Sequence, residues 1–239
     1  ATSCSACFLN LYKTDNHMGI DDKLNTQVNQ ALAAGGLAYD PGTLNVRHLL
    51  DIMVEDVGYD EIAAHVGQPL KGLRVAPYYG CLIVRPFYEG NPEYPTHMDK
   101  LLEVLGATVV DFPMKAHCCG GHMSQISEDT ALELIRRILF NAEEYNADVI
   151  ATVCPMCQLN LDAYQGFVNR NHNTDFDMPV LYFTQLMGLA YGIDEKKLAL
   201  GSEIVSAKKA LAKIGQVEEE KPKKRKRRDK KALPIPSPE

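Results

Sequence analysis

Short apolar runs separated by amphipathic segments organise the middle of the chain. Buried strands are expected over three of these runs, at 73–79 (LRVAPYY), 107–112 (ATVVDF) and 148–153 (DVIATV). Helices are expected between them, over 96–105 and 128–145. In the second helix, apolar residues recur at the helical period: Leu132, Ile135, Leu139 and Ala142. Strands that alternate with helices predict an α/β fold with a parallel sheet.

Cysteines follow each of the three expected strands. Cys81 comes after the first, Cys118 and Cys119 after the second, and Cys154 and Cys157 after the third. The carboxyl ends of parallel strands lie along one edge of a sheet, where ligands bind. We therefore expect these five cysteines to converge. A further helix, expected over 158–169, opens at the CPMC motif, and a helix N-terminus favours thiolates.

Each possible role of the five cysteines would use a different number of them. Structural zinc takes four ligands, usually from two CxxC-type pairs, and adjacent cysteines such as Cys118 and Cys119 would be unusual there. A thioredoxin-like redox role would use Cys154 and Cys157 and leave the others without a function. Inert burial suits a lone cysteine better than five at strand ends. Iron–sulfur clusters use thiolates generously, although ordinary ones use four.

The cysteine count also bears on the compartment. The chain has seven cysteines, an odd number with one adjacent pair, which is a poor disulfide framework. Its N-terminus has no basic segment followed by an apolar run, so we expect a reducing compartment, the cytoplasm. No stretch approaches the roughly 18 consecutive apolar residues of a membrane span.

Charge is distributed unevenly. The formal net charge is −6, yet 221–231 (KPKKRKRRDKK) holds nine basic residues and one acid. Like charges repel and few apolar side chains are present, so we expect 218–239 to be a disordered basic tail. Such a tail is either a solvated extension or an arm that docks on an acidic partner. Nucleic-acid binding is not expected, because the tail lacks aromatic residues and the rest of the chain is acidic.

The chain contains an internal repeat. Residues 1–11 (ATSCSACFLNL) and 151–161 (ATVCPMCQLNL) share seven identical positions at an offset of 150. The segment 46–61 likewise lines up with 180–195. We therefore expect two related modules.

The first module is expected to be incomplete. It lacks a counterpart of the segment that carries Cys81, Cys118 and Cys119, and the chain starts with Ala at what should be a strand end, as in a fragment or a trimmed chain. The expected organisation is the end of the first module at 1–66, a complete second module at 67–200, a C-terminal helix at 201–217 and the tail.

The spacing of the five cysteines resembles that of the cysteine-rich CCG domain found in the B subunit of heterodisulfide reductase. The resemblance extends through YYGCLIVRP at 78–86, HCCGG at 117–121 and VCPMCQLNLD at 153–162. It covers most of residues 1–200. One departure is Leu82 directly after Cys81, where the methanogen form usually has a histidine.

The resemblance implies a noncubane [4Fe–4S] cluster on Cys81, Cys118, Cys119, Cys154 and Cys157. Cys4 and Cys7 match the CxxC of a second cluster site whose other ligands are absent. Paired clusters of this kind are understood to cleave a disulfide substrate by passing one electron to each sulfur.

The resemblance also implies partners and an enzyme class. Electrons would come from a flavin-containing subunit through a ferredoxin-like subunit, and the chain would be the oxidoreductase subunit that acts on a disulfide. The alternative is a non-catalytic electron-relay subunit, as in glycolate or lactate oxidases and some succinate or fumarate reductases.

Four residues beside the cysteine pair have expected roles. His117 and His122 flank the pair, and either could donate a proton to a leaving thiolate or instead hydrogen-bond cluster sulfide or backbone. Gly120 and Gly121 are expected to let the backbone pass close to a bulky cofactor.

Overall fold

The computed structural model describes residues 1–85 and 90–216, and the predicted basic tail at 218–239 lies outside them. Four parallel strands form one sheet in the order β2-β1-β3-β4. Their bounds are β1 Arg74–Tyr78, β2 Thr108–Val109, β3 Val149–Thr152 and β4 Val180–Tyr182. The predicted α/β fold with a parallel sheet is therefore confirmed.

Helices flank the sheet and precede it in the chain. Their bounds are α1 Ser5–Ile20, α2 Asp22–Ala33, α3 Leu49–Asp51, the π-helix η1 Ile52–Val57, α4 Tyr59–Ala64, α5 His97–Val104, α6 Glu128–Glu144, α7 Pro155–Ala163, α8 Gln165–His172, α9 Phe183–Ala190 and α10 Lys208–Leu211.

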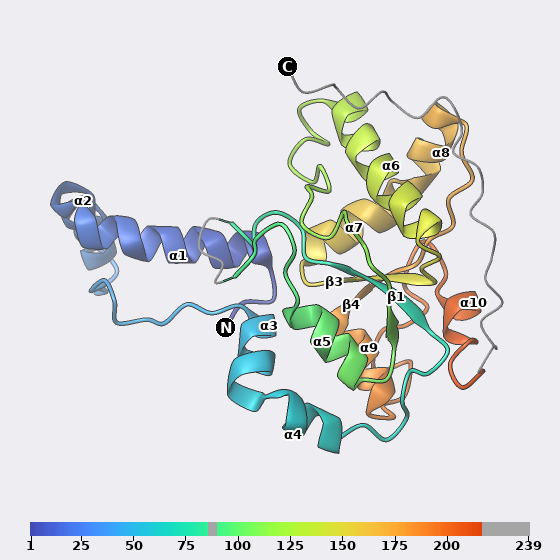
Figure 1. The fold of residues 1–239 in the computed structure, drawn as a ribbon. Helices are drawn as coiled ribbons and strands as arrows, with labels where there is room; N and C mark the ends of the chain where they lie inside the picture. The colour runs from blue at the N-terminus through green and yellow to red at the C-terminus, as the bar shows by residue number, and fades with distance from the viewer. Residues whose placement is uncertain (86–89, 217–239) are drawn as a thin grey trace.

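The sheet is the middle of three layers (Figure 1). One face packs on α5 and α9, with Leu101, Leu102 and Phe183 fully buried there. The other face packs on α6, α7 and α8, with Ile135 and Leu161 fully buried. Successive strand residues alternate between the two cores, because side chains of a strand point to opposite faces. Such strands are apolar along their whole length, which is why the runs could be recognised in the sequence.

The N-terminal helices form an arm beside this layered body (Figure 1). α1 buries four residues, Ser5, Ala6, Leu9 and Met18, and α2 buries none. The arm joins the body at its base, where Thr2 forms a parallel bridge with His48. Most of the surface of both helices therefore lies away from the core.

Two predicted elements differ from the structure. The strand expected over 107–112 is limited to β2, because it is an edge strand and Pro113 and a turn at Lys115 follow it. The helix expected over 158–169 is instead α7, which begins at Pro155, and α8. The two helices are separated at Tyr164 (φ −92°, ψ 0°), next to Gln165, whose buried side chain donates to the backbone carbonyl of Leu161 at 3.0 Å.

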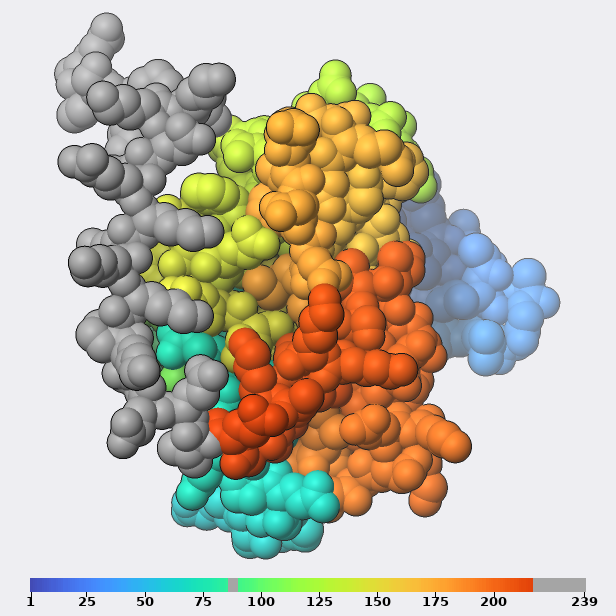
Figure 2. Space-filling model, turned by 90° about the vertical axis from the view of Figure 1, so that its right-hand side faces the viewer, coloured from blue at the N-terminus to red at the C-terminus, as the bar shows by residue number. Residues whose placement is uncertain are grey.

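The segment after α9 lies against the body. Figure 2 shows it, in red, on one face of the molecule. The Asp162 carboxylate accepts hydrogen bonds from the backbone amides of Ile204 and Val205, both at 2.9 Å. Where a helix was expected over 201–217, the described part of the chain has only the short α10. Buried Ala207 and Ala210 attach this segment to the core.

Candidate metal centre

The candidate site lies at the topological switch point of the sheet, where the strand order reverses. β1 has β2 on one side and β3 on the other. A crevice therefore forms outside the carboxyl ends of β1 and β3, the position where ligands bind in open α/β sheets. Cys81 comes shortly after β1, and Cys154 follows β3 as the N-cap of α7.

The chain after β2 returns to the same edge. Its loop carries Cys118 and Cys119 and is fixed by two hydrogen bonds, because the backbone carbonyl of Lys115 accepts from the amides of Tyr79 and Gly80 at 2.8 and 3.0 Å. This places the adjacent cysteines opposite the residue that follows Gly80, which is Cys81.

All five expected cysteines line one pocket: Cys81, Cys118, Cys119, Cys154 and Cys157. Cys119, Cys154 and Cys157 are buried, whereas Cys81 and Cys118 are half-buried. The sulfur atoms of Cys119 and Cys157 are 3.3 Å apart. The convergence expected from strand ends is therefore what the structure has.

Hydrogen bonds between thiols split the pKa values of Cys81 and Cys118. The bond from Cys81 lowers the pKa of Cys118 to about 6, and the Gly120 amide, 3.3 Å from the Cys118 sulfur, adds to this. The same bond, together with burial, raises the pKa of Cys81 well above its ordinary value. Cys118 is therefore the member of this pair that favours the thiolate.

The pKa of Cys154, at the start of α7, is lowered as well. A hydrogen bond from Cys157 lowers the pKa of Cys154 to about 5, with further lowering by the backbone amides of Cys157, Ser5 and Met156. The free amides of a helix N-terminus stabilise negative charge, and here they come from the starts of both α7 and α1, since Ser5 begins α1. The thiol of Cys157 also lowers the pKa of Cys119.

A buried charge network supports the two cysteine loops. Lys115 is 1% exposed, and its ammonium group pairs with Asp99 and lies 4.3 Å from the centre of the Tyr94 ring. The Tyr79 hydroxyl donates to Asp99 at 2.6 Å and accepts from the backbone amide of Met98 at 2.7 Å. Nothing in the sequence pattern indicated this network, because its members come from three separate segments.

Two further contacts hold the cysteines in place. The buried amide of Asn160 donates to the backbone carbonyl of Cys119 at 2.6 Å, which ties α7 to the loop. Gly80 has φ +72°, and a Cβ atom there would lie 3.3 Å from the sulfur of Cys157. The sequence offered a signal for Asn160 alone, since it is one of the residues that the internal repeat keeps.

The four residues beside the cysteine pair occupy different places. His122 and Gly121 line the pocket. His117 is exposed and outside the pocket lining, and its backbone carbonyl accepts from the Tyr78 hydroxyl at 2.6 Å. Gly120 faces α6, because a Cβ atom there would lie 3.0 Å from the backbone of Ala131. Of the two glycines, Gly121 is the one at the pocket.

Cys4 and Cys7 separate in the structure. The sulfur of Cys4 is 3.9 Å from the sulfur of Cys154, and burial raises the pKa of its thiol. Cys7 is exposed on α1. Of the two cysteines in the first CxxC motif, only Cys4 therefore lies at the edge of the pocket.

The donor set fits an iron–sulfur cluster. Five cysteine sulfurs surround one pocket, and Cys118, Cys119 and Cys154 favour the thiolate state that ligates iron. The adjacent cysteines and the fifth sulfur exceed what a tetrahedral zinc site uses. Softness of the donors excludes a magnesium or calcium site.

Comparison with protein families agrees with this donor set. Residues 75–162 match the CCG cysteine-rich domain, a range that includes all five cysteines. Among solved structures, a hypothetical protein from Helicobacter pylori is similar with a TM-score of 0.64 and 12% identity, over 84% of this chain and 36% of that one. This second likeness bears on the fold alone.

Two characterised relatives match most of the chain. The 8-methylmenaquinol:fumarate reductase membrane anchor subunit of Wolinella succinogenes is 34% identical over 212 residues, which cover 87% of this chain and 72% of the relative. The B subunit of the ferredoxin:CoB-CoM heterodisulfide reductase of Methanosarcina mazei is 31% identical over 221 residues, with coverage of 90% and 73%. The chain therefore belongs to the family of heterodisulfide reductase B subunits, proteins with cysteine-rich CCG domains.

Proposed function

We propose that this chain is the iron–sulfur catalytic subunit of a heterodisulfide reductase-like complex. The observation that carries the proposal is the convergence of five cysteine sulfurs on one pocket at the switch point of the sheet. Family membership supports an iron–sulfur protein that takes part in electron transfer. The proposal goes further, since it assigns a disulfide as substrate and a noncubane [4Fe–4S] cluster as cofactor.

The proposed ligands are Cys81, Cys118, Cys119, Cys154 and Cys157. A noncubane [4Fe–4S] cluster bound there would supply electrons one at a time. Reduction of a disulfide to two thiols takes two electrons and two protons. His122 lines the pocket on its exposed side and is the proposed proton donor. Leu82 also lines the pocket, which gives the substrate an apolar contact beside Cys81.

A two-module organisation is part of the proposal, and the geometry around the repeats supports it. Cys4 and Cys154 are both helix N-caps, with φ and ψ of −125° and 123° for Cys4 and −132° and 119° for Cys154. The bridge between Thr2 and His48 occupies the same repeat position as the pairing of Thr152 with Tyr182. We therefore propose that 1–66 is the end of a first module and 67–200 a second.

The two proposed modules meet close to the pocket. The Tyr182 hydroxyl donates to the backbone carbonyl of Ser3 at 2.6 Å, next to Cys4. Cys4 and Cys154 hold matching repeat positions and face each other. In this arrangement Cys4 and Cys7 are the proposed ligands of a second cluster. A substrate between the two sites could receive one electron from each.

The expected partners follow from the relatives. Relatives of this chain are subunits of heterodisulfide reductase complexes, which supports a subunit role. We propose a flavin-containing and a ferredoxin-like subunit as electron donors, and a cytoplasmic location because seven cysteines with one adjacent pair are a poor disulfide framework. Among the described residues, no helix is long and apolar enough to cross a membrane.

An electron-relay role is the second candidate. The similarity to a fumarate reductase subunit favours it, because that relative belongs to a complex whose name gives fumarate as the substrate. In this case the chain would pass electrons between a quinone or partner subunit and another centre, and no disulfide would bind at the pocket.

Turnover of disulfides separates the two functions. The purified, cluster-containing complex is supplied with a one-electron reductant and a panel of thiol-derived disulfides, and thiol release is measured. Catalytic function predicts thiol release at a rate that depends on the disulfide offered. A cluster that is reduced without any thiol release would support the relay instead.

A further inference from the structure

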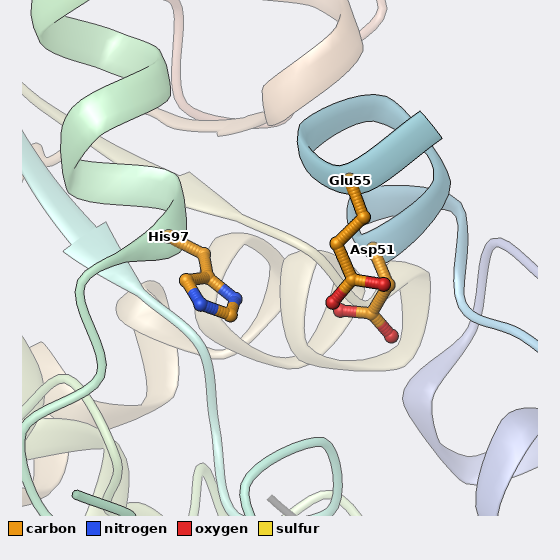
Figure 3. A group of neighbouring side chains, drawn as sticks. All are labelled: Asp51, Glu55 and His97. Atoms are coloured by element: carbon orange, nitrogen blue, oxygen red, sulfur yellow. The ribbon is translucent and has the colours of Figure 1, made fainter. Parts of the chain in front are cut away.

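A group of three potential metal ligands lies away from the cysteine pocket. Asp51 ends α3, Glu55 lies in η1, and His97 is the first residue of α5. One ligand atom from each lies within 4.8 Å of the other two. Figure 3 shows the imidazole of His97 turned toward the two carboxylates, which come from the neighbouring helix.

The immediate surroundings leave negative charge in this group. Asp51 is half-buried, and its carboxylate lies beside that of Glu55. Arg47 pairs with Glu55 through Oε2 at 2.5 Å and with Asp56 at 2.6 Å, so its one positive charge is shared between two carboxylates. The other oxygen of Glu55, Oε1, can therefore serve as a ligand.

The backbone of this segment is unusual. η1 is a π-helix of six residues, Ile52–Val57, directly after Asp51. π-Helical turns are rare and occur often at functional sites, because regular α-helical bonding is more stable. Here the turn carries the Glu55 carboxylate beside Asp51 and presents both to α5.

We propose that Asp51, Glu55 and His97 form a binding site for a first-row divalent metal ion, separate from the cysteine pocket. Imidazole nitrogen and carboxylate oxygen together suit zinc, manganese and iron(II), whereas the thiolates of the pocket suit softer centres. Metal–ligand distances of about 2.0–2.2 Å require the three side chains to close in slightly around the ion. Water completes the coordination, since the Glu55 side chain is 54% exposed.

The ion would join two parts of the molecule. α3 and η1 belong to the segment between the arm and the sheet, and α5 packs on the sheet. Asp99, two residues after His97, pairs with Lys115 under the cysteine loop. Metal bound to the folded state alone stabilises it, so the ion would strengthen the support of this loop without touching the pocket.

Manganese is the probe that distinguishes this site from the thiolates. The cluster-loaded protein is first treated with a chelator, and Mn²⁺ is then titrated while the electron paramagnetic resonance signal of free Mn²⁺ is recorded. We expect about one Mn²⁺ per chain, with release of that Mn²⁺ on addition of Zn²⁺, which binds such sites more tightly.

Variants locate the bound ion. Asp51→Asn, Glu55→Gln and His97→Gln should each weaken Mn²⁺ binding by about tenfold or more, with unchanged iron content. Asp60→Asn, an exposed acid of α4 with the same change of charge, should bind as the wild type does. Thermal unfolding establishes that each variant is folded, and three separate ligand variants keep the test valid if one is not. Wild-type protein that binds no Mn²⁺, or equal loss in Asp60→Asn, would overturn the proposal.

Discussion

The seven cysteines of this chain have distinct environments although two pairs of them share one sequence motif. Cys154 and Cys157 are buried at the start of α7, whereas Cys4 is half-buried and Cys7 is exposed at the start of α1. At α7, the Asn160 side chain is hydrogen-bonded to the backbone carbonyl of Cys119, which holds the loop with Cys119 against this helix. Spacing alone therefore does not determine what a CxxC pair contacts.

Substitution of single cysteines tests the ligand assignment. Cys119→Ser removes a buried sulfur from the centre of the pocket, and we expect the iron content of this site to fall to a small fraction of the wild-type value. Cys7→Ser is the comparison variant, because Cys7 is exposed outside the pocket and this sequence does not contain the other ligands of its proposed cluster, so the iron content should stay at the wild-type value. Iron and sulfide analysis of the anaerobically purified variants provides the measurement. Equal iron loss from both variants would contradict the assignment.

The two histidines beside the cysteine pair differ in position and therefore in expected effect. His122 lines the pocket and His117 does not. If His122 donates a proton during disulfide reduction, His122→Gln should lower the rate of thiol release by about a hundredfold with the cluster content unchanged. His117→Gln should leave the rate within about twofold. A wild-type rate in the His122→Gln variant would mean that this imidazole takes no part in the reaction.

Burial of His48 predicts a pH dependence of stability. Its side chain is 0% exposed, and burial lowers its pKa to about 4 from its ordinary value of 6.5. The folded protein then binds fewer protons than the unfolded chain between these values, so its stability falls as the pH drops from 6.5 towards 4. The shift corresponds to about 3 kcal/mol in total, and about 2 kcal/mol of this is lost by pH 5.

Comparison with His48→Gln isolates this contribution. Glutamine can still accept the hydrogen bond that the backbone amide of Leu50 donates to His48. Denaturant unfolding at pH 7.5 and pH 5 should show a smaller loss of stability in the variant than in the wild type. Asp51 contributes with the opposite sign, but it does so equally in both proteins. Identical pH dependence would show that His48 is not held neutral.

The buried pair of Lys115 and Asp99 supports the loops that carry the cysteines. Lys115→Met leaves the Asp99 carboxylate, whose side chain is 16% exposed, without its cation. We expect a loss of about 3 kcal/mol in the free energy of unfolding, as for other broken buried pairs. The double variant with Asp99→Asn should recover part of this loss, because the carboxylate charge is removed and the Tyr79 hydroxyl can still donate. A change below about 1 kcal/mol in the single variant would contradict this account.

Elements could be predicted where the pattern was strong. The strands β1 and β3 and the helices α5 and α6 are recognisable in the sequence, because each strand is mostly apolar and each helix has one apolar face. β4 has only three residues and was not recognised as a strand. The break between α7 and α8 lies beside the buried Gln165, whose side chain bonds to the backbone of Met178, and such contacts leave no periodic signal in a sequence.

The candidate site was predictable to a similar extent. The five cysteines could be assigned because a parallel sheet gathers its strand ends at one edge. The supporting role of Lys115 could not be predicted, since a lysine is ordinarily a surface residue and its partner Asp99 lies in a different segment. The proximity of Cys4 to Cys154 also depends on how the arm packs on the body. Residues that act through tertiary contacts can be identified only from a three-dimensional structure.

At the scale of the whole molecule, the repeat and the site are connected. The matching helix starts at Cys4 and Cys154 come together beside the pocket, and the hydroxyl of Tyr182 bridges them through Ser3. We infer that the chain holds an iron–sulfur cluster on the five cysteines of this pocket.

The most direct test is the iron and acid-labile sulfide content of the anaerobically purified chain, with electron paramagnetic resonance after oxidation in the presence of a thiol. We expect about four irons and four sulfides per chain from the five-cysteine site, with a signal that depends on the thiol. One zinc ion per chain without sulfide would contradict it, since the cysteines would then form a structural site.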